Sequence, residues 1–470
     1  MTFSIGKPLY YSLFFFALAL AFREGLSPYA DFDLWLHLFI GKETISNSLN
    51  FFDNYSFTAT GSPVFNHEWL SQVLISKIFL LFGDLSLFAW KIAFFVGILT
   101  LIWIAFKNIK NDFSRVVLFI LCIVSLRPGI SFRLQIFSYL FLTLLIVLEE
   151  GFLGKKLSGE RFKLYFYPFL FLFWANIHGA FLLGLAVLGL YTITSDRGIF
   201  LKKSLVLVLA IFATFINPYG VDVYFYIFHE ITLDISKEFI TEWQPFSFNF
   251  REIGFFVIFI YVLIGSLFCF KIINFKNLTL FVVAIWLGFG SVRNTPLVAI
   301  MGLPILVSLT NRLFLKEGGA GGSHKLYSLI SIPLFCMGIF MLSTTNYVFK
   351  VSIEDDNYPV RSVGFLKSKG IKGNLALPLH WGGYSLFHLY PNMKVSIDGR
   401  WATVYNEKIM QTSNNLSYRS TNRNWEKILS EMGADYFIAE IDNPAISEFK
   451  TSQNWSILFI EDGAVLLKKN

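Results

Sequence analysis

The sequence is poor in charged residues and in cysteine. Charged side chains make up 15% of the 470 residues, well below the roughly 25% of ordinary soluble domains. The three cysteines, Cys122, Cys269 and Cys336, lie inside apolar runs without paired spacing or a nearby ligand partner. They are therefore interpreted as small core residues. These shortages argue against an ordinary soluble domain, a disulfide framework and a cysteine metal site.

The sequence also lacks a signal-peptide cleavage site and a continuous stripe of basic residues. The apolar run at residues 8–22 is followed by Arg23 and Glu24 and not by a small-residue cleavage site, so it predicts a retained first span instead of a removed signal peptide. The net charge is +7, but the basic residues lie in short clusters between apolar runs. Because they do not form one stripe, the sequence argues against a nucleic-acid partner.

Hydrophobic residues are abundant, at 55% of the chain, with a mean hydropathy of +0.57. This composition predicts a polytopic α-helical membrane protein with about 11 spans. The apolar runs lie at residues 8–22, 85–106, 116–126, 134–149, 164–175, 179–194, 203–216, 253–270, 278–291, 296–311 and 326–345. Several are shorter than the roughly 20 residues of a straight crossing, so short, broken or tilted helices are expected. Residues 68–83 are expected to form an interfacial or bent lead-in to the second span.

Every second loop between these runs is basic. Lysine and arginine gather at residues 107–115, 155–163, 197–203, 271–276 and 312–325. Cytoplasmic loops carry such an excess, so the N-terminus is predicted to be cytoplasmic and the chain after residue 345 to lie outside. The glycine-rich segment Glu317–Ser323 is predicted to be a flexible linker.

The first outer loop, residues 23–84, opens with two acids and a histidine. These are Asp31, Asp33 and His37, within the stretch Asp31–Leu38. If a helix begins at about Asp33, Asp33 and His37 share one face. One interpretation is chemistry at the membrane surface; the other is an interfacial helix whose acids cap its N-terminus.

The other outer loops also carry ionisable residues. They hold His67 and Glu68, Arg127 and Arg133, His178, Glu242, and Arg293. Ordinary capping of span ends would explain some of them. Ionisable groups near hydrocarbon are costly, however, and are functional candidates by default. The pattern therefore favours a site on the outer side.

From residue 346 the apolar runs shorten and charges of both signs mix. Residues 346–470 are predicted to form a periplasmic α/β domain, apart from a transmembrane domain at 1–345. The expected helices are 359–369 and 423–432; the expected strands are 374–379, 394–398 and 435–441, with a hairpin of 455–460 and 464–469. The stretch from His380 to Tyr384, with Trp381, precedes Asp398 and Arg400. It is interpreted either as a turn capped by Asp398 or as a loop folding over the membrane site.

Together these motifs resemble the GT-C superfamily of polyprenyl-phosphate-dependent glycosyltransferases. The resemblance lies in an Asp-x-Asp after span one, many short spans with polar outer ends, and an outer α/β domain after the last span. The layout is similar to oligosaccharyltransferases, aminoarabinose transferases and protein mannosyltransferases. The acid of the oligosaccharyltransferase Trp motif is replaced here by Gly382 and Gly383, so recognition of an asparagine acceptor is not implied.

The resemblance implies inverting transfer of a sugar from a lipid-linked phosphate, at the periplasmic face of a bacterial inner membrane, to a lipid, glycan or protein acceptor. Asp31 or Asp33 would be the base. Arg127, Arg133 or Arg293 would bind the leaving phosphate. The remaining candidates for substrate binding are His37, His67, Glu68, His178, Glu242, Trp381, Tyr384, Asp398 and Arg400.

Two questions stay open at this point. His67 and Glu68 would bind a divalent ion or position the phosphate, so a metal cofactor is undecided. The alternative function is a lipid-linked saccharide transporter or a non-catalytic partner in envelope-glycan assembly. Transport would require polar residues along the inner half of the spans, and the sequence has few. The glycosyltransferase hypothesis predicts that the acids of the Asp-x-Asp motif and the candidate arginines meet in one pocket.

Overall fold

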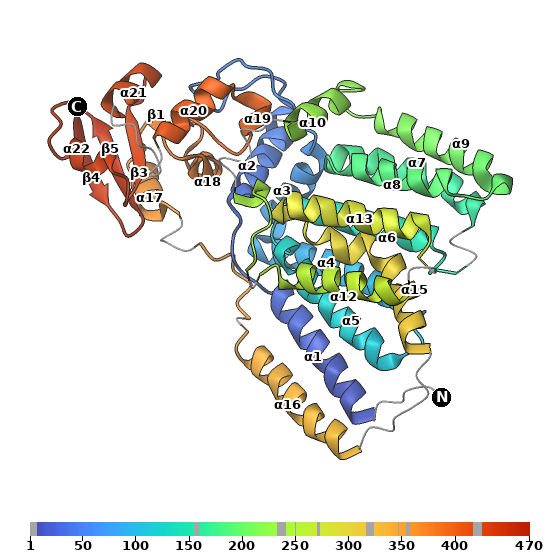
Figure 1. Cartoon of the computed structure of the whole chain (residues 1–470). Coiled ribbons are helices and arrows are strands. Elements are labelled where there is room, and N and C mark those ends of the chain that lie inside the picture. The colour runs from blue at the N-terminus through green and yellow to red at the C-terminus, as the bar shows by residue number, and fades with distance from the viewer. Residues whose placement is uncertain are drawn as a thin grey trace. The chain divides into compact units, whose positions relative to one another are not determined.

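A computed structural model of the chain describes residues 7–154, 159–232, 241–249, 251–269, 273–315, 324–345, 347–353, 358–416 and 425–470. The predicted linker Glu317–Ser323 lies outside these ranges. The chain divides into two compact units. Unit 1 comprises residues 1–28, 88–220 and 240–349, and unit 2 comprises residues 29–87, 221–239 and 350–470. The two are described separately, with the element labels of Figure 1.

Unit 1 is helical, because its apolar runs are long and contain few helix breakers. Its helices are α1 (Lys7–Gly25), most of α4 (Asp84–Phe106), α5 (Asp112–Leu126), α6 (Gln135–Glu149), α7 (Glu160–Ile177), α8 (Phe181–Ile193), α9 (Arg197–Thr214), α12 (Ile253–Cys269), α13 (Phe275–Gly290), α14 (Leu297–Met301), α15 (Leu303–Leu315) and α16 (His324–Ser343). Short 3₁₀ turns lie at Arg127–Gly129 (η1), Thr241–Trp243 (η2) and Val292–Asn294 (η4). Every predicted apolar run is therefore confirmed as helical.

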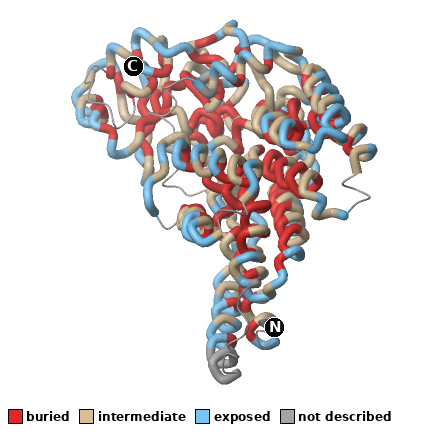
Figure 2. The backbone as a smooth tube through the Cα atoms, turned by 45° about the vertical axis from the view of Figure 1, so that its right-hand side comes forward, coloured by how far each residue is buried: buried red, intermediate tan, exposed pale blue. Residues whose placement is uncertain are grey.

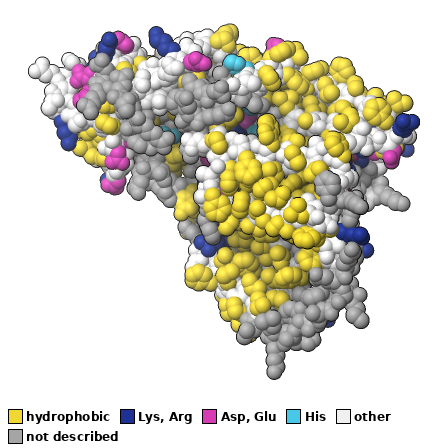
Figure 3. Space-filling view, in the orientation of Figure 1, with side chains coloured by type: hydrophobic (Ala, Val, Ile, Leu, Met, Phe, Trp, Pro, Cys, Tyr) yellow, Lys and Arg dark blue, Asp and Glu magenta, His cyan; other side chains and the backbone are white. Residues whose placement is uncertain are grey.

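The number of membrane spans is a separate matter. Among the described residues, one helix, Asp84–Phe106, is long and apolar enough to cross a membrane. A second candidate is the pair Val292–Met301 and Leu303–Phe314, which bends by 54°. The count of eleven spans is thus not confirmed, because most helices are shorter than a straight crossing. Hydrophobic side chains cover much of the face shown in Figure 3. Leu267 and Phe268 of α12 and Trp286 of α13 are among the exposed large hydrophobic residues of unit 1.

Glu149 and Glu150, at the C-terminal end of α6, form ion pairs within unit 1. Glu149, at the end of α6, lies 2.9 Å from the Lys163 ammonium of α7 and 2.6 Å from that of Lys203 in α9. The next residue, Glu150, lies 2.6 Å from Lys276 in α13. Each acid is compensated by a lysine, as burial of charge requires. These lysines, which had indicated cytoplasmic loops, therefore also tie four helices together.

Unit 2 combines the segment after α1 with the C-terminal segment. Its elements are α2 (Phe32–Asn47), α3 (Trp69–Phe82), α10 (Asp222–Thr232), α17 (Val360–Ser368), β1 (Gly373–Ala376), α18 (Leu379–Leu389), β2 (Met393–Val395), α19 (Trp401–Val404), α20 (Glu407–Asn415), α21 (Trp425–Met432), β3 (Tyr436–Glu440), α22 (Ala445–Phe449), β4 (Trp455–Ile460) and β5 (Ala464–Lys469). The five-stranded sheet has the order β2-β1-β3-β5-β4. Strands β2, β1 and β3 are parallel, and β5 pairs antiparallel with β3 and β4.

The predicted α/β elements are largely confirmed. The β4–β5 hairpin has the expected bounds, and α17 and α21 match the expected helices. Helix α21 is followed by Gly433 at φ +77°, a left-handed conformation that glycine adopts readily. The strand expected at 394–398 ends already at Val395. Buried residues follow the sheet in Figure 2, and Phe437, Val465 and Leu467 belong to its core.

One prediction in this segment is wrong. The stretch from His380 to Tyr384 was expected as a turn or as a loop over the membrane site. It lies instead inside helix α18. Both glycines, Gly382 and Gly383, are helical and buried, although glycine in a helix interior costs about 1 kcal/mol relative to alanine. Close packing around both glycines offsets this cost.

Candidate functional site

The Asp-x-Asp motif begins helix α2. Asp31 is the N-cap residue, and its side chain accepts a hydrogen bond of 3.2 Å from the Asp33 backbone N–H. The capping interpretation is therefore confirmed for Asp31. Asp33 lies in the first helical turn, where the helix dipole stabilises a carboxylate. The two acids thus have different local roles.

Helix α18 packs tightly against α2. A Cβ added to Gly383 would lie 2.8 Å from Leu36 Cβ and 3.0 Å from the Leu36 backbone nitrogen. Beside this contact, the Trp35 and Tyr384 rings meet edge to face at 5.6 Å between centroids. Trp381 is buried as well. Tyr384 therefore packs against α2, where Gly383 permits the close approach, and Gly382 permits the approach of the backbone at Ile397 and Asp398.

Substituting either glycine should destabilise unit 2. A Cβ on Gly382 would lie 2.1 Å from the Ile397 carbonyl oxygen, and overpacking of this kind typically costs about 1–3 kcal/mol. We expect Gly382→Ala and Gly383→Ala to lower the unfolding temperature of the purified chain by several degrees. Gly364→Ala is the matched control, because Gly364 is exposed in α17 with no atom near its added Cβ. It should be neutral or slightly stabilising. Equal melting temperatures for all three variants would contradict this packing.

Asp398 and Arg400 form a buried ion network. The Arg400 guanidinium bonds to Asp398 at 2.8 and 2.6 Å and lies 2.8 Å from a carboxylate oxygen of Asp53. The Tyr405 hydroxyl donates to Asp398 at 2.7 Å. Burial by itself would raise the pKa of Asp398, but the charge and hydrogen bonds of Arg400 hold that pKa below its usual range. Arg400 therefore ties the first outer loop to the segment after β2.

Gly399, between these two residues, approaches Asp33. One carboxylate oxygen of Asp33 lies 3.3 Å from the position that a Cβ on Gly399 would take, and Leu36 Cδ2 lies 3.0 Å from it. Gly399 also lines a pocket of unit 2. Asp33 is thus next to a wall of that pocket, although residues 33 and 399 are far apart in the sequence.

Two histidines and a glutamate lie near one another beside α2 and α3. The Nδ1 of His37 lies 3.2 Å from the Gln72 side-chain amide and 3.9 Å from Glu68. The Nε2 of His67 also lies 3.9 Å from Glu68. Asn66 donates to Gln72 at 2.7 Å. The structure thereby brings together three candidates that the sequence had placed 30 residues apart.

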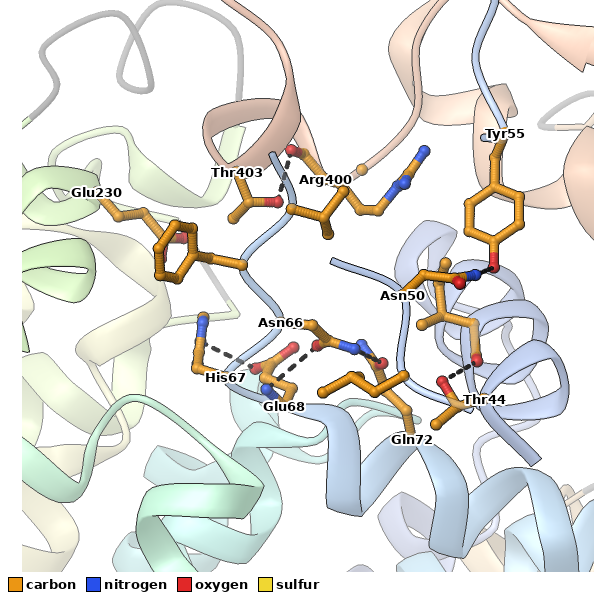
Figure 4. Close-up of a pocket in the computed structure, with 15 residues that line it drawn as sticks. Thr44, Asn50, Tyr55, Asn66, His67, Glu68, Gln72, Glu230, Arg400 and Thr403 are labelled. Atoms are coloured by element: carbon orange, nitrogen blue, oxygen red, sulfur yellow. Dashed lines mark hydrogen bonds and ion pairs between the residues drawn. The ribbon is translucent and has the colours of Figure 1, made fainter. Parts of the chain in front are cut away.

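His67, Glu68, Asn66 and Gln72 line a small pocket whose surface is partly polar and partly apolar. It has a volume of about 100 Å³. Figure 4 shows its polar side chains arriving from α2, the following loop, α3, α10 and the segment after β2. The lining residues are Ile40, Thr44, Leu49, Asn50, Tyr55, Val64, Phe65, Asn66, His67, Glu68, Gln72, Glu230, Gly399, Arg400 and Thr403.

A metal site at His67 and Glu68 would need a third ligand. Zinc, for example, takes at least three protein ligands at about 2.0–2.3 Å. Within the described ranges, no group of three or more His, Cys, Asp and Glu side chains is arranged to hold a metal ion. The residues present do not fit a resident metal, so no step proposed below uses one.

In unit 1, two of the three candidate arginines form ion pairs. Arg127, in η1, lies 3.3 Å from a carboxylate oxygen of Glu24. Arg133 forms an ion pair with Glu242 of η2. Glu242, which stands alone in its loop in the sequence, therefore has a partner from a distant outer loop. These pairs neutralise much of the positive charge of both guanidinium groups.

The third arginine has a different environment. The Arg293 guanidinium lies over the Trp243 ring at 5.1 Å from its centroid, and it makes no ion pair with a carboxylate of the described chain. The Arg293 carbonyl accepts hydrogen bonds from the Tyr139 hydroxyl at 3.0 Å and the Gln135 amide at 3.4 Å. The backbone at Arg293 is thus fixed by α6, and its side chain stacks on η2.

His178 is buried and tied to its own turn. Its Nδ1 accepts from the Ala180 backbone N–H at 3.1 Å and lies 3.0 Å from the Ser138 hydroxyl. Trp174 donates to the same hydroxyl at 2.8 Å. These contacts order the connection between α7 and α8.

Sequence reasoning missed Asp53, Tyr55, Gln72 and Glu230. The Asp53 carboxylate accepts from the backbone N–H groups of Tyr55 and Ser56, and an Asp that precedes such a turn is a recognisable local signal. Gln72 and Glu230 have no such signal. Their place in the pocket depends on how α3 and α10 pack within unit 2.

Comparisons with known proteins show a likeness of structure only. No protein-family model matches the sequence, and no curated protein matches it. The apo oligosaccharyltransferase of Archaeoglobus fulgidus is similar with a TM-score of 0.58 at 10% identity, over 92% of this chain and 69% of that chain. The archaeal oligosaccharyltransferase AglB from the same organism, in complex with an inhibitory peptide and a dolichol-phosphate, matches with a TM-score of 0.58 at 10% identity, over 92% and 70%.

A further match is the mycobacterial arabinofuranosyltransferase AftD, with a TM-score of 0.47 at 12% identity, over 98% of this chain and 40% of that chain. That similarity is too low to carry an argument. The archaeal matches cover most of this chain and more than two thirds of their own. The chain therefore shares the fold of the archaeal oligosaccharyltransferase over 92% of its length.

Proposed function

We propose that this chain is a membrane glycosyltransferase that transfers a sugar from a polyprenyl-phosphate donor to an acceptor on the periplasmic side of a bacterial inner membrane. The observation that carries the proposal is the Asp-x-Asp motif at the N-terminus of α2, in a chain with this fold. The AglB structure contains a dolichol-phosphate, which supports a lipid phosphate as the donor class. The basic alternate loops support the orientation.

The proposed base is Asp33. An acceptor hydroxyl becomes a better nucleophile when a carboxylate takes its proton as the new bond forms. Asp31 already caps α2 through the Asp33 backbone N–H, whereas the Asp33 carboxylate approaches Gly399 at the pocket wall. Attack from the side opposite the phosphate inverts the configuration at the sugar carbon. We therefore assign proton transfer to Asp33 and the positioning of α2 to Asp31.

The proposed phosphate ligand is Arg293. The leaving phosphate gains negative charge as its bond to the sugar breaks, and a guanidinium stabilises that charge with two parallel hydrogen bonds. Arg127 and Arg133 already compensate Glu24 and Glu242. Arg293 is held by stacking on Trp243 instead, so binding of phosphate would break no ion pair with a carboxylate in the described part of the chain.

The test is sugar transfer by the purified full chain in lipid nanodiscs. The donors are undecaprenyl phosphates that each carry one radiolabelled sugar, including glucose, mannose and aminoarabinose. We expect one of these donors to be consumed with release of undecaprenyl phosphate, which chromatography of the lipid fraction measures. Failure of a folded, membrane-inserted chain to consume any of the donors would refute the proposed function.

A further inference from the structure

The charged residues that line the pocket of unit 2 are mostly acidic. Its charged lining residues include two carboxylates, Glu68 from the end of the first outer loop and Glu230 from α10. Its one arginine, Arg400, is already paired with Asp53 and Asp398. The lining is thus net negative. Such a pocket repels phosphate and sulfate, so it does not suit the phosphate end of a lipid-linked donor.

The uncharged lining suits a ligand with many hydroxyl groups. Side-chain amides of Asn50, Asn66 and Gln72 offer both donors and acceptors, and Thr403 adds a hydroxyl. Burial raises the pKa of Tyr55 to about 12, so its hydroxyl stays protonated and can donate. Sugar hydroxyls donate and accept at once, and alternating partners of this kind satisfy them.

Two aromatic side chains are also part of the pocket lining. These are Tyr55 and Phe65, and the Phe65 ring stacks on Tyr226 of α10 at 4.3 Å between centroids. The apolar C–H face of a sugar ring packs well on such rings.

We propose that this pocket binds a neutral sugar unit of the acceptor, with Glu68 and Glu230 as carboxylates that accept hydrogen bonds from its hydroxyl groups. This inference rests on the proposed function for its role as acceptor site. It narrows the acceptor class from lipid, glycan or protein to a glycan or another molecule that presents a neutral sugar.

The geometry gives the acceptor a base. Gly399 lines the pocket, and Asp33 approaches Gly399 from α2. In the reaction, the acceptor oxygen forms a bond to the anomeric carbon of the donor sugar, and its proton passes to Asp33. The bond between that carbon and the phosphate oxygen breaks, and its electron pair leaves with the lipid phosphate. No oxidant or reductant is required.

Binding of neutral sugars to the full chain in nanodiscs tests the inference. The probes are methyl glucoside, methyl mannoside, methyl galactoside and N-acetylglucosamine, followed by saturation-transfer NMR. We expect at least one sugar to bind, and Glu230→Gln and Glu68→Gln to weaken its binding at least about tenfold, because a charged acceptor becomes a neutral amide. Glu431→Gln is the matched control, since Glu431 of α21 is 67% exposed and does not line the pocket. It should bind the sugar like the parent chain.

Competition experiments and the two pocket variants can contradict the inference. Inorganic phosphate or a peptide containing Asn-Val-Thr that displaces the sugar would overturn it, as would unchanged sugar binding in both pocket variants or no sugar binding at all. The donor assay separates this result from the proposed function. Transfer to sugar should fall in Glu230→Gln, whereas Glu431→Gln should consume the donor and transfer to sugar like the parent chain. If the parent chain consumes no donor but Glu230→Gln still weakens sugar binding, the function fails and the sugar site stands.

Discussion

Replacing Asp33 by asparagine should lower the rate of sugar transfer by roughly 10²- to 10⁴-fold, the range over which a positioned general base contributes. Asparagine has nearly the shape of aspartate but cannot take a proton from the acceptor hydroxyl. The variant should keep the fold and lose at most about 1 kcal/mol of stability, because Asp33 lies in the first turn of α2 but is not its N-cap residue. The measurement is the single-turnover rate of transfer at saturating donor, together with the unfolding temperature.

Asp31 provides the matched comparison within the same motif. Asparagine is as good an N-cap as aspartate, so Asp31→Asn should keep the bond to the Asp33 N–H and most of the transfer rate. Asp31→Ala removes the cap and should cost about 1 kcal/mol of stability. The opposite result, with Asp31→Asn inactive and Asp33→Asn active, would assign the base to Asp31 and refute the division of roles.

Much of the helical structure could be predicted because its signal is local. A run such as residues 253–270 is apolar throughout, and a chain segment of this kind forms a helix to satisfy its backbone. The hairpin β4–β5 was equally clear, because alternating strands flank Asp462 and Gly463. Treating residues 296–311 as one apolar run misses the break between α14 and α15, although Gly302 and Pro304 mark that break.

Helix α18 shows why the rest could not be predicted. Two consecutive glycines after Trp381 favour a turn by local propensity. They are helical here because α2 and the segment at Ile397 leave no room for a Cβ. Leu36, which faces Gly383 in the structure, lies more than 340 positions away from it in the sequence. Tertiary packing therefore overrides the local preference, and only the structure reveals it.

The candidate site was likewise predictable only in part. The residue types were visible in the sequence, since acids, histidines and arginines are rare in so apolar a chain. Their partners were not. Arg133 and Glu242 come from different loops, as do Arg400 and Asp53. Spacing along the chain cannot rank the arginines, whereas their partners in the structure distinguish Arg293 from the other two.

That distinction leads to a second large expected effect. Arg293→Gln should reduce the rate of sugar transfer by roughly 10²- to 10³-fold, comparable to removal of one donor that stabilises developing negative charge. Arg293→Lys should recover only part of the loss, because an ammonium cannot make the two parallel hydrogen bonds of a guanidinium and stacks less well on Trp243. The measurement is again the single-turnover rate with a lipid-linked donor.

The paired arginines serve as the comparison. Arg127→Gln leaves Glu24 without the guanidinium that lies 3.3 Å away, and Arg133→Gln does the same to Glu242. Both changes should lower the unfolding temperature more than Arg293→Gln and the transfer rate less. Arg293 would contact a charged phosphate, and salt screens such a contact. The transfer rate of Arg293→Gln should therefore depend less on salt concentration than the transfer rate of the parent chain. If Arg127→Gln or Arg133→Gln instead abolished transfer in a stable chain, that arginine would be the phosphate ligand, and stacking on Trp243 would serve only to pack η2 against η4.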